Sequence, residues 1–356
     1  MDHINISEQH KKIIIFNWVN SREGIGRYTR DLYIYSQPYS EMVNFIMRKE
    51  DLKQHYDGTV VEGFYPPFMK SGFFLNHYMF KYIFRKRLKE IKRYVDKGLK
   101  IHYSFLSMPP VFNNPDNIIT MFDLIFLKYP QYVLTPFMKL LKKHLKIYKE
   151  FNNVIAISNY VKKDLINYGF TGNIEVIYPP VSGTFSHIGD KAGIRKKLKL
   201  PLDKKLVLSV SSTEYRKNLS TVYRTIKLLG PEYRLIRIGE GSENSINFRN
   251  VDDNTINMIY NASDVLLFPT LEEGFGYPVT EAFATGLPVV SSNIEVIKEI
   301  AYDAAILVEP TASECVRAVK EAINNSELLQ KKGFERVRLF STDKFSYNIK
   351  NYYKKI

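Results

Sequence analysis

Two carboxylates flank a glycine-rich loop that leads into a helical pattern: Glu273 precedes the loop and Glu281 follows it. Gly274 and Gly276 permit positive φ angles and close approach of a ligand to the backbone, and Pro278 suits the first turn of a helix. Free N–H groups at a helix start attract anions, whereas the carboxylates would repel phosphate and suit hydrogen bonds from sugar hydroxyls. The alternative is an ordinary strand–helix connection in which Glu281 merely favours the helix dipole.

A basic pair, Arg216 and Lys217, follows a predicted strand at 206–210 and precedes a helical pattern at 219–229. A guanidinium can bind two phosphate oxygens at once, and an ammonium acts as a point charge. Such a pair suits a diphosphate and would neutralise the charge that develops on a departing phosphate group. The alternative is an exposed, solvated pair with no ligand.

Alternating strand and helix patterns position these residues, which predicts an α/β chain of two doubly wound domains, each with a mostly parallel sheet. Ligands bind at the carboxyl ends of the strands in such sheets. The predicted strands are 11–15, 60–64, 99–103, 118–121, 154–157 and 174–178 in the first half, then 206–210, 233–238, 265–268 and 289–291. The predicted parts are a first domain (1–185), a linker (186–204), a second domain (205–340) and a C-terminal helix (341–356) that crosses back to the first domain.

The composition fits a globular chain of two domains, with 356 residues, 45% hydrophobic and 25% charged. The single cysteine, Cys315, excludes an intrachain disulfide and Cys-based zinc sites. Neither a run of about 18 apolar residues nor an apolar signal core in residues 1–10 is present, so we expect a cytoplasmic protein. The net charge of +14 favours phosphate-rich partners or is simply a solvated surface. Without a nucleic-acid-binding motif, nucleic acid is not an expected partner.

The pattern Glu273, seven residues, Glu281 resembles the E-x7-E motif of the retaining glycosyltransferases of family 4. The resemblance continues through 286–293 and 303–310 and covers nearly the whole second half of the chain. It implies the GT-B fold, two Rossmann-like domains that face each other across a cleft.

The resemblance also implies roles for individual residues. In that family the second glutamate binds the ribose of the donor nucleotide and the first lies near the donor sugar, roles that fall on Glu281 and Glu273. The implied donor-binding residues are Gly24, Ile25, Gly26, Arg27, Arg216, Lys217, Val251, Gly274, Phe275, Gly276 and Glu281. The implied catalytic residues are Glu273, Arg216, Lys217 and Asp123.

Two positions depart from the family pattern. The family usually has His before the aspartate, where this chain has Phe122 before Asp123, and His102 is the nearest histidine that could contact the sugar instead. A glycine that often follows the strand before the basic pair is Ser211 here. Asp123 could alternatively cap the next helix, and a lone histidine at a strand end is often structural.

A basic amphipathic pattern spans residues 78–95, with an apolar stripe and interspersed lysines and arginines. Such a helix can lie on an anionic membrane, which would make the protein peripheral. The alternative is a helix whose apolar face packs on the core.

The resemblance implies transfer of a hexose from a UDP- or GDP-sugar to an acceptor hydroxyl, with retention of configuration and no required metal or other cofactor. The expected partners are the nucleotide-sugar donor and a glycan, lipid-linked or protein acceptor. One alternative, suggested by Phe122 and Ser211, is an inactive glycosyltransferase-like binding or scaffold subunit. Another is a glycoside phosphorylase of related fold, although the sequence reveals no phosphate subsite or cofactor lysine for it.

Overall fold

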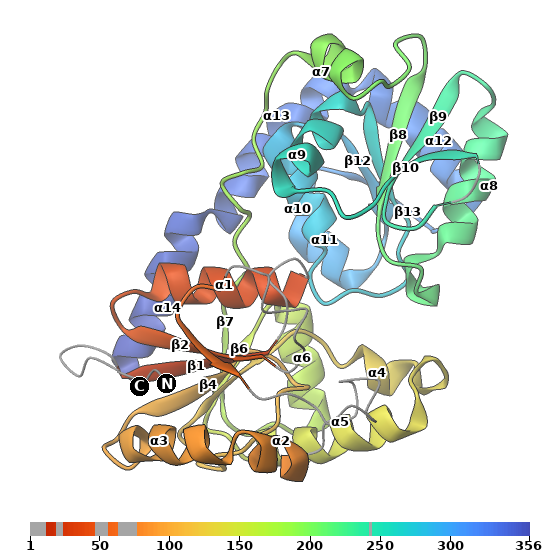
Figure 1. The fold of residues 1–356 in the computed structure, drawn as a ribbon. Coiled ribbons are helices and arrows are strands. Elements are labelled where there is room, and N and C mark those ends of the chain that lie inside the picture. The colour runs from red at the N-terminus through yellow and green to blue at the C-terminus, as the bar shows by residue number, and fades with distance from the viewer. Residues whose placement is uncertain (1–11, 19–23, 47–55, 63–76, 242–243) are drawn as a thin grey trace. The chain divides into compact units, whose positions relative to one another are not determined.

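A computed structural model describes residues 12–18, 24–46, 56–62, 77–241 and 244–356 of the chain, without the side chains of 77–79. The chain divides into two compact units. The first contains Met1–Pro180 together with Asp343–Ile356, and the second contains Val181–Thr342. Each unit has one parallel β-sheet with helices on both faces (Figure 1).

The first unit contains a seven-stranded sheet of order β3-β2-β1-β4-β5-β6-β7. The strands are β1 (Ile13–Asn17), β2 (Ser40–Ile46), β3 (Thr59–Glu62), β4 (Lys100–Tyr103), β5 (Ile118–Met121), β6 (Asn153–Ala156) and β7 (Asn173–Val176). The helices are α1 (Gly24–Ser36), α2 (His77–Ile83), α3 (Arg85–Val95), α4 (Ile125–Lys128), α5 (Thr135–Tyr148), α6 (Asn159–Tyr168) and α14 (Thr342–Lys355).

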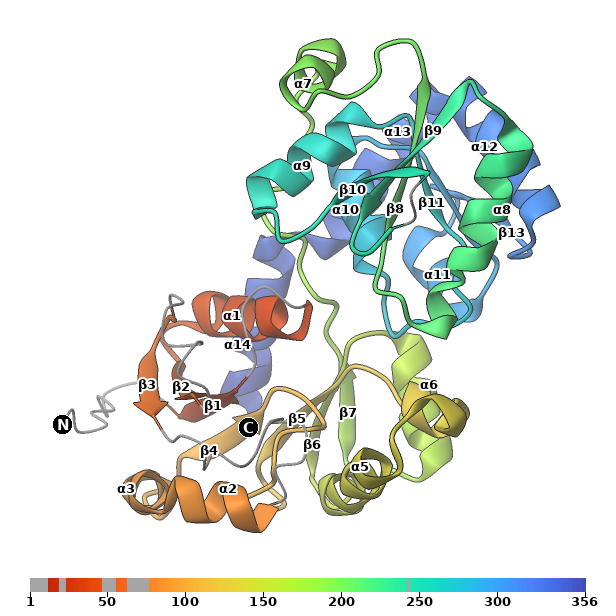
Figure 2. The same ribbon diagram turned by 45° about the vertical axis from the view of Figure 1, so that its right-hand side comes forward.

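Strand β4 shows how both faces of this sheet are covered, because successive side chains of a strand point to opposite faces. The ring of Tyr103 packs against Tyr148 of α5 at a centroid distance of 5.3 Å. The neighbouring His102 contacts the hydroxyl of Tyr353 on α14 at 2.6 Å. Helices α2, α3 and α5 therefore cover one face, and α1 and α14 the other (Figures 1 and 2).

The second unit contains a six-stranded sheet of order β10-β9-β8-β11-β12-β13. The strands are β8 (Lys205–Val210), β9 (Tyr233–Ile238), β10 (Ser245–Phe248), β11 (Val265–Phe268), β12 (Val289–Ser292) and β13 (Ile306–Val308). The helices are α7 (Lys191–Lys197), α8 (Leu219–Leu229), α9 (Asp253–Ala262), α10 (Tyr277–Thr285), α11 (Glu295–Ala301), α12 (Ala312–Asn324) and α13 (Ser326–Val337). One apolar core, which includes Val207, Leu235 and Val319, lies between the strands and helices α8 and α12.

Segment 186–204, expected to be a linker, packs on the second unit instead. It contains α7, whose Arg195 guanidinium bonds to the Asp264 carboxylate at 2.7 Å. The same carboxylate oxygen accepts a hydrogen bond from the Leu206 N–H, at the start of β8, at 2.7 Å. Two asparagines of α9, Asn257 and Asn261, accept hydrogen bonds from the backbone at 186 and 188.

Candidate active site

The basic pair lies in the turn that joins β8 to α8. After β8 the chain forms a short 3-10 helix, Tyr215–Lys217, and Asn218 then takes the left-handed conformation at φ 53°. The Asn218 amide donates hydrogen bonds to the carbonyl oxygens of Pro269 at 3.0 Å and Pro310 at 3.2 Å. These bonds tie the turn to the segments that follow β11 and β13, so the pair sits at the carboxyl edge of the sheet.

The glycine-rich loop follows β11 at the same edge. Gly276 has φ +103° and precedes α10, and Pro278 occupies the first turn of that helix. A Cβ atom at Gly276 would lie 3.0 Å from the Ile297 side chain, and side chains rarely adopt that φ, so both space and conformation favour glycine.

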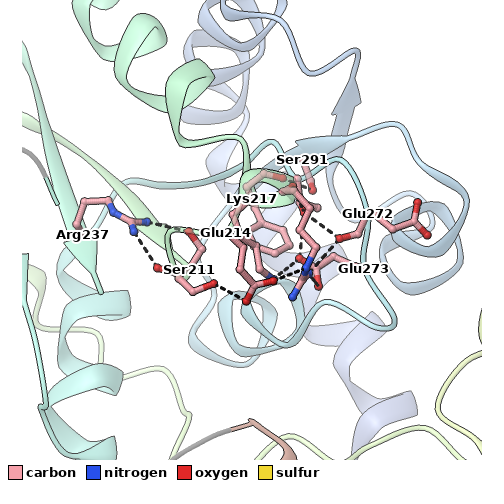
Figure 3. Close-up of polar contacts among 11 residues, drawn as sticks. Ser211, Glu214, Lys217, Arg237, Glu272, Glu273 and Ser291 are labelled. Atoms are coloured by element: carbon pink, nitrogen blue, oxygen red, sulfur yellow. Dashed lines mark hydrogen bonds and ion pairs between the residues drawn. The ribbon is translucent and has the colours of Figure 1, made fainter. Parts of the chain in front are cut away.

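Glu273 joins the loop to the basic pair, as Figure 3 shows. Its Oε2 accepts a hydrogen bond from Arg216 Nη1 at 3.1 Å, and its Oε1 accepts one from Lys217 Nζ at 2.6 Å. The Thr270 hydroxyl donates to Oε1 at 3.0 Å. Only 7% of Glu273 is exposed. Its carboxylate therefore holds both cations in place, in addition to any contact with a sugar.

A second carboxylate, Glu214, holds the outer side of the arginine. Its Oε2 accepts from Arg216 Nε at 2.8 Å, and its Oε1 accepts from the Ser212 hydroxyl at 3.0 Å. Partial burial raises the pKa of Glu214, but the charge and hydrogen bonds of Arg216 and Ser212 outweigh burial and lower it overall. Two carboxylates and two cations are formally neutral, so the arrangement orients the cations without a bound anion.

Glu281 lies in α10, almost completely buried. Its Oε2 accepts a hydrogen bond from the Tyr260 hydroxyl of α9 at 2.7 Å. Val251 lies partly buried in the connection between β10 and α9, directly before Asp252, whose carboxylate caps α9.

The candidate residues of the first unit are separated among several elements. Gly24, Ile25, Gly26 and Arg27 form the first turn of α1. The Asp123 carboxylate accepts a hydrogen bond from the Ile125 N–H at 3.0 Å, at the start of α4. Phe122, which stands where the resembled family usually has histidine, packs edge-to-face on Tyr28 at 5.0 Å.

His102 is fully buried, and both of its ring nitrogens have partners. Nδ1 contacts the Tyr353 hydroxyl at 2.6 Å, and Nε2 contacts the Thr120 hydroxyl at 2.8 Å. Burial lowers the pKa of His102 to about 3, so the ring is neutral. The expectation that His102 contacts a sugar does not fit this place in the core, where the ring joins β4 and β5 to α14.

The amphipathic pattern at 78–95 forms two helices, α2 and α3. Its apolar residues Phe80, Phe84, Leu88 and Ile91 are buried, and the aromatic pair packs on Phe45 of β2 at 4.9 Å for each ring. The apolar stripe therefore faces the core. The exposed face carries Lys81, Tyr82, Arg85, Lys86, Lys89, Lys92 and Arg93.

Within the residues described, no cluster of histidine, cysteine, aspartate or glutamate could hold a metal ion. No helix in the described part of the chain is both long enough and apolar enough to cross a membrane.

Some residues of this site were not predicted from the sequence, namely Glu214, Thr270, Tyr260 and Arg237. One sequence feature could have indicated Arg237. It is an arginine at the fifth position of β9, next to the apolar Leu235 and Ile236. A charged residue inside such a strand is rarely buried without a specific partner.

Residues 190–333 match the family model described as glycosyl transferases group 1. The chain is 26% identical over 171 residues to the O-antigen chain mannosyltransferase B of Escherichia coli, covering 41% of this chain and 45% of that protein. It is 26% identical over 229 residues to the O-antigen chain mannosyltransferase RfbU of Salmonella typhimurium, covering 59% and 61%. The matched region thus spans about half the length of these relatives.

Solved structures show the fold of the whole chain. The sucrose-phosphate synthase of Thermosynechococcus elongatus superposes with a TM-score of 0.74 at 18% identity, over 97% of this chain and 99% of that one. Anabaena HepE in complex with UDP-glucose superposes with a TM-score of 0.76 at 14% identity, over 98% and 100%. The chain therefore has the GT-B fold, and its region 190–333, which contains the basic pair and both glutamates, matches the family model of the glycosyl transferases of group 1.

Proposed function

We propose that this protein is a retaining glycosyltransferase that moves a hexose from a nucleoside diphosphate sugar to an acceptor hydroxyl without a metal ion. The observation that supports the proposal most strongly is the cation pair, Arg216 and Lys217, held by Glu273 beside the glycine-rich loop. In the proposed reaction the two cations stabilise the departing nucleoside diphosphate. The acceptor hydroxyl attacks from the same face, and its proton passes to an oxygen of that diphosphate.

Mannose is the sugar that we propose, and a growing saccharide chain is the acceptor. Both follow from the two O-antigen chain mannosyltransferases that part of this chain resembles. A protein of the same fold binds UDP-glucose, so we propose either UDP or GDP as the nucleotide of the donor.

The test is a thermal-shift screen of the full chain against UDP, GDP, ADP and TDP and their sugars, with and without EDTA. A shift with one nucleoside diphosphate that survives EDTA is expected, since a ligand that binds only the folded protein stabilises it. Turnover of the matching nucleotide-sugar, followed by NMR of the anomeric proton, then tests retention. Binding without turnover on any acceptor would favour the scaffold alternative, and no binding would refute the proposal.

We further propose a peripheral membrane association through the basic face of α2 and α3, which would bring the enzyme to a lipid-linked acceptor. Basic side chains with the 79% exposed Tyr82 suit an anionic surface, although the buried apolar stripe takes no part. The triple substitution Lys86→Ser, Lys89→Ser and Arg93→Ser should reduce sedimentation with phosphatidylglycerol vesicles and leave stability unchanged.

The matched control replaces three exposed lysines of the second unit, Lys227 of α8, Lys320 of α12 and Lys331 of α13. Equal vesicle binding by the triple variant and this control would contradict the assignment of the membrane surface.

A further inference from the structure

Arg237 is among the largest fully buried side chains of the described chain, with 0% exposed. It lies near the end of β9. This strand pairs directly with β8, whose end leads to the basic pair. Burial of a guanidinium is unfavourable unless its N–H groups donate hydrogen bonds. The acceptors of these bonds therefore indicate the role of Arg237.

The guanidinium bonds to the end of β8 and to the turns after β8 and β9, interacts with Tyr223 of α8, and bonds to no carboxylate in the part of the chain that the structure describes. Its Nη1 donates to the Ser209 hydroxyl at 3.0 Å and to the Ser211 hydroxyl at 3.1 Å. Its Nη2 donates to the Ser211 carbonyl at 2.8 Å and to the Glu240 carbonyl at 2.9 Å. Arg237 thus joins the turn after β8 to the turn after β9.

Gly239 brings these two turns close together. A Cβ atom there would lie 2.4 Å from the carbonyl oxygen of Ser211, and its φ is +119°. The approach is therefore available only to glycine. Ser211, where the family often has glycine, supplies the hydroxyl that Arg237 binds.

The turn held by Arg237 is the turn that carries the cations. Ser211 is followed by Ser212, whose hydroxyl bonds to Glu214, and Glu214 bonds to Arg216. Arg216 and Lys217 then share Glu273. Figure 3 shows Arg237 at one end of this network and Glu273 at the other, with Ser211 and Glu214 between them.

We propose that Arg237 is a positioning residue for the donor diphosphate, acting through Ser211 and the turn that carries Arg216 and Lys217. The role rests on the proposed function. Arg237 contacts no ligand itself, since its side chain is fully buried. It fixes the inner end of the turn, while Glu214 and Glu273 fix the outer end.

The first measurement is calorimetric binding of UDP, UMP, GDP and GMP to wild type and to Arg237→Met, Arg237→Lys and Ser211→Ala. Arg237→Met should weaken the preferred nucleoside diphosphate about tenfold or more, because buried carbonyls and hydroxyls lose their donor. The matching monophosphate should lose much less, since it lacks the second phosphate that the cation pair would bind. Arg237→Lys should restore part of the loss.

The matched control is Arg234→Met, which removes another arginine of β9 away from the two turns. Ser211→Ala should show a small loss in wild type and none in the Arg237→Met background, because the two side chains act through one hydrogen bond. If Arg237→Met does not fold, the same comparison of diphosphate and monophosphate binding is made with Arg237→Lys and Ser211→Ala.

Hydrogen exchange of the unliganded protein separates this proposal from the proposed function. Arg237→Met should exchange faster than Arg234→Met in peptides covering 206–217. Equal exchange, or equal loss of diphosphate and monophosphate binding, would overturn the positioning role while leaving the transferase proposal intact. A wild type that binds no nucleotide would refute the proposed function and the donor role with it.

Discussion

Replacing Glu273 with glutamine tests whether this carboxylate holds the basic pair. The substitution keeps the size of the side chain and an oxygen that can accept from Lys217 and Thr270. It removes the charge and places an amide N–H₂ or a neutral oxygen before Arg216 Nη1, now 3.1 Å from Oε2. Two cations then lack the carboxylate that both of them contact.

The expected loss follows from the burial of the three side chains. Breaking a fully buried ion pair costs about 3–5 kcal/mol. Here the exposed fractions of the Arg216, Lys217 and Glu273 side chains are 21%, 13% and 9%, so solvent screens part of the charge. We therefore expect a loss of about 2 kcal/mol in the free energy of unfolding of the second unit, after discounting for that exposure. This corresponds to a melting temperature lower by roughly 4–8 °C.

The assay is thermal unfolding with and without the nucleoside diphosphate that binds wild type. The diphosphate should raise the melting temperature of Glu273→Gln at least as much as that of wild type, because its charge compensates the cations that the substitution exposed. Glu309→Gln, at an exposed glutamate of the same unit, is the control. If Glu273→Gln melts like wild type, Glu273 does not organise the pair and the reasoning fails.

Three further predictions concern polar groups that are buried or partly buried. Asp264→Asn should destabilise the second unit by about 2 kcal/mol at neutral pH. Burial raises the pKa of the Asp264 carboxyl, but Lys191, the Leu206 N–H and Arg195 lower it overall. The difference in unfolding free energy between wild type and Asp264→Asn, measured in urea, should therefore shrink as the pH falls below about 4. His102 has a folded pKa near 3, below the unfolded value of about 6.5, so acid should destabilise wild type by about 1.4 kcal/mol per pH unit between these values, and His102→Gln should remove that slope. Glu281→Ala should weaken nucleoside diphosphate binding by about 1–3 kcal/mol, whereas Tyr260→Phe, which removes only the hydroxyl that bonds to Glu281, should weaken it less; unchanged calorimetric affinity in Glu281→Ala would remove the ribose assignment.

Strong hydrophobic patterns were the most predictable part of the fold. Strands β5, β9 and β11 and helix α8 have the predicted bounds. Strand β2 was not predicted because Ser40, Glu41 and Asn44 interrupt its apolar pattern, although all seven residues are buried. The Asn44 side chain, for example, bonds to Asn17 at 2.8 Å, a partner that sequence spacing does not reveal.

Part of the candidate site could likewise be predicted from the sequence, and part could not. The chemical types and the approximate place of Glu273, Arg216 and Lys217 could be inferred from the sequence, because they follow strands whose ends meet at one edge of a sheet. That Glu273 binds both cations could not, since it depends on the conformation of two loops. The burial of His102 was also hidden, because its partner Tyr353 lies 251 residues away along the chain.

The long separation between β4 and α14 has a consequence for biosynthesis. The ribosome releases residues 13–176, with all seven strands of the first sheet, before any of α14 exists. The second unit, by contrast, is continuous from Val181 to Thr342 and can fold as soon as it emerges, since domains generally fold as units. Until α14 arrives, Tyr28 and His102 lack the ring and hydroxyl that contact them in the finished protein. While the second unit is being translated, the nascent first unit therefore lacks the cover that α14 later gives to part of one sheet face, on which α1 also packs.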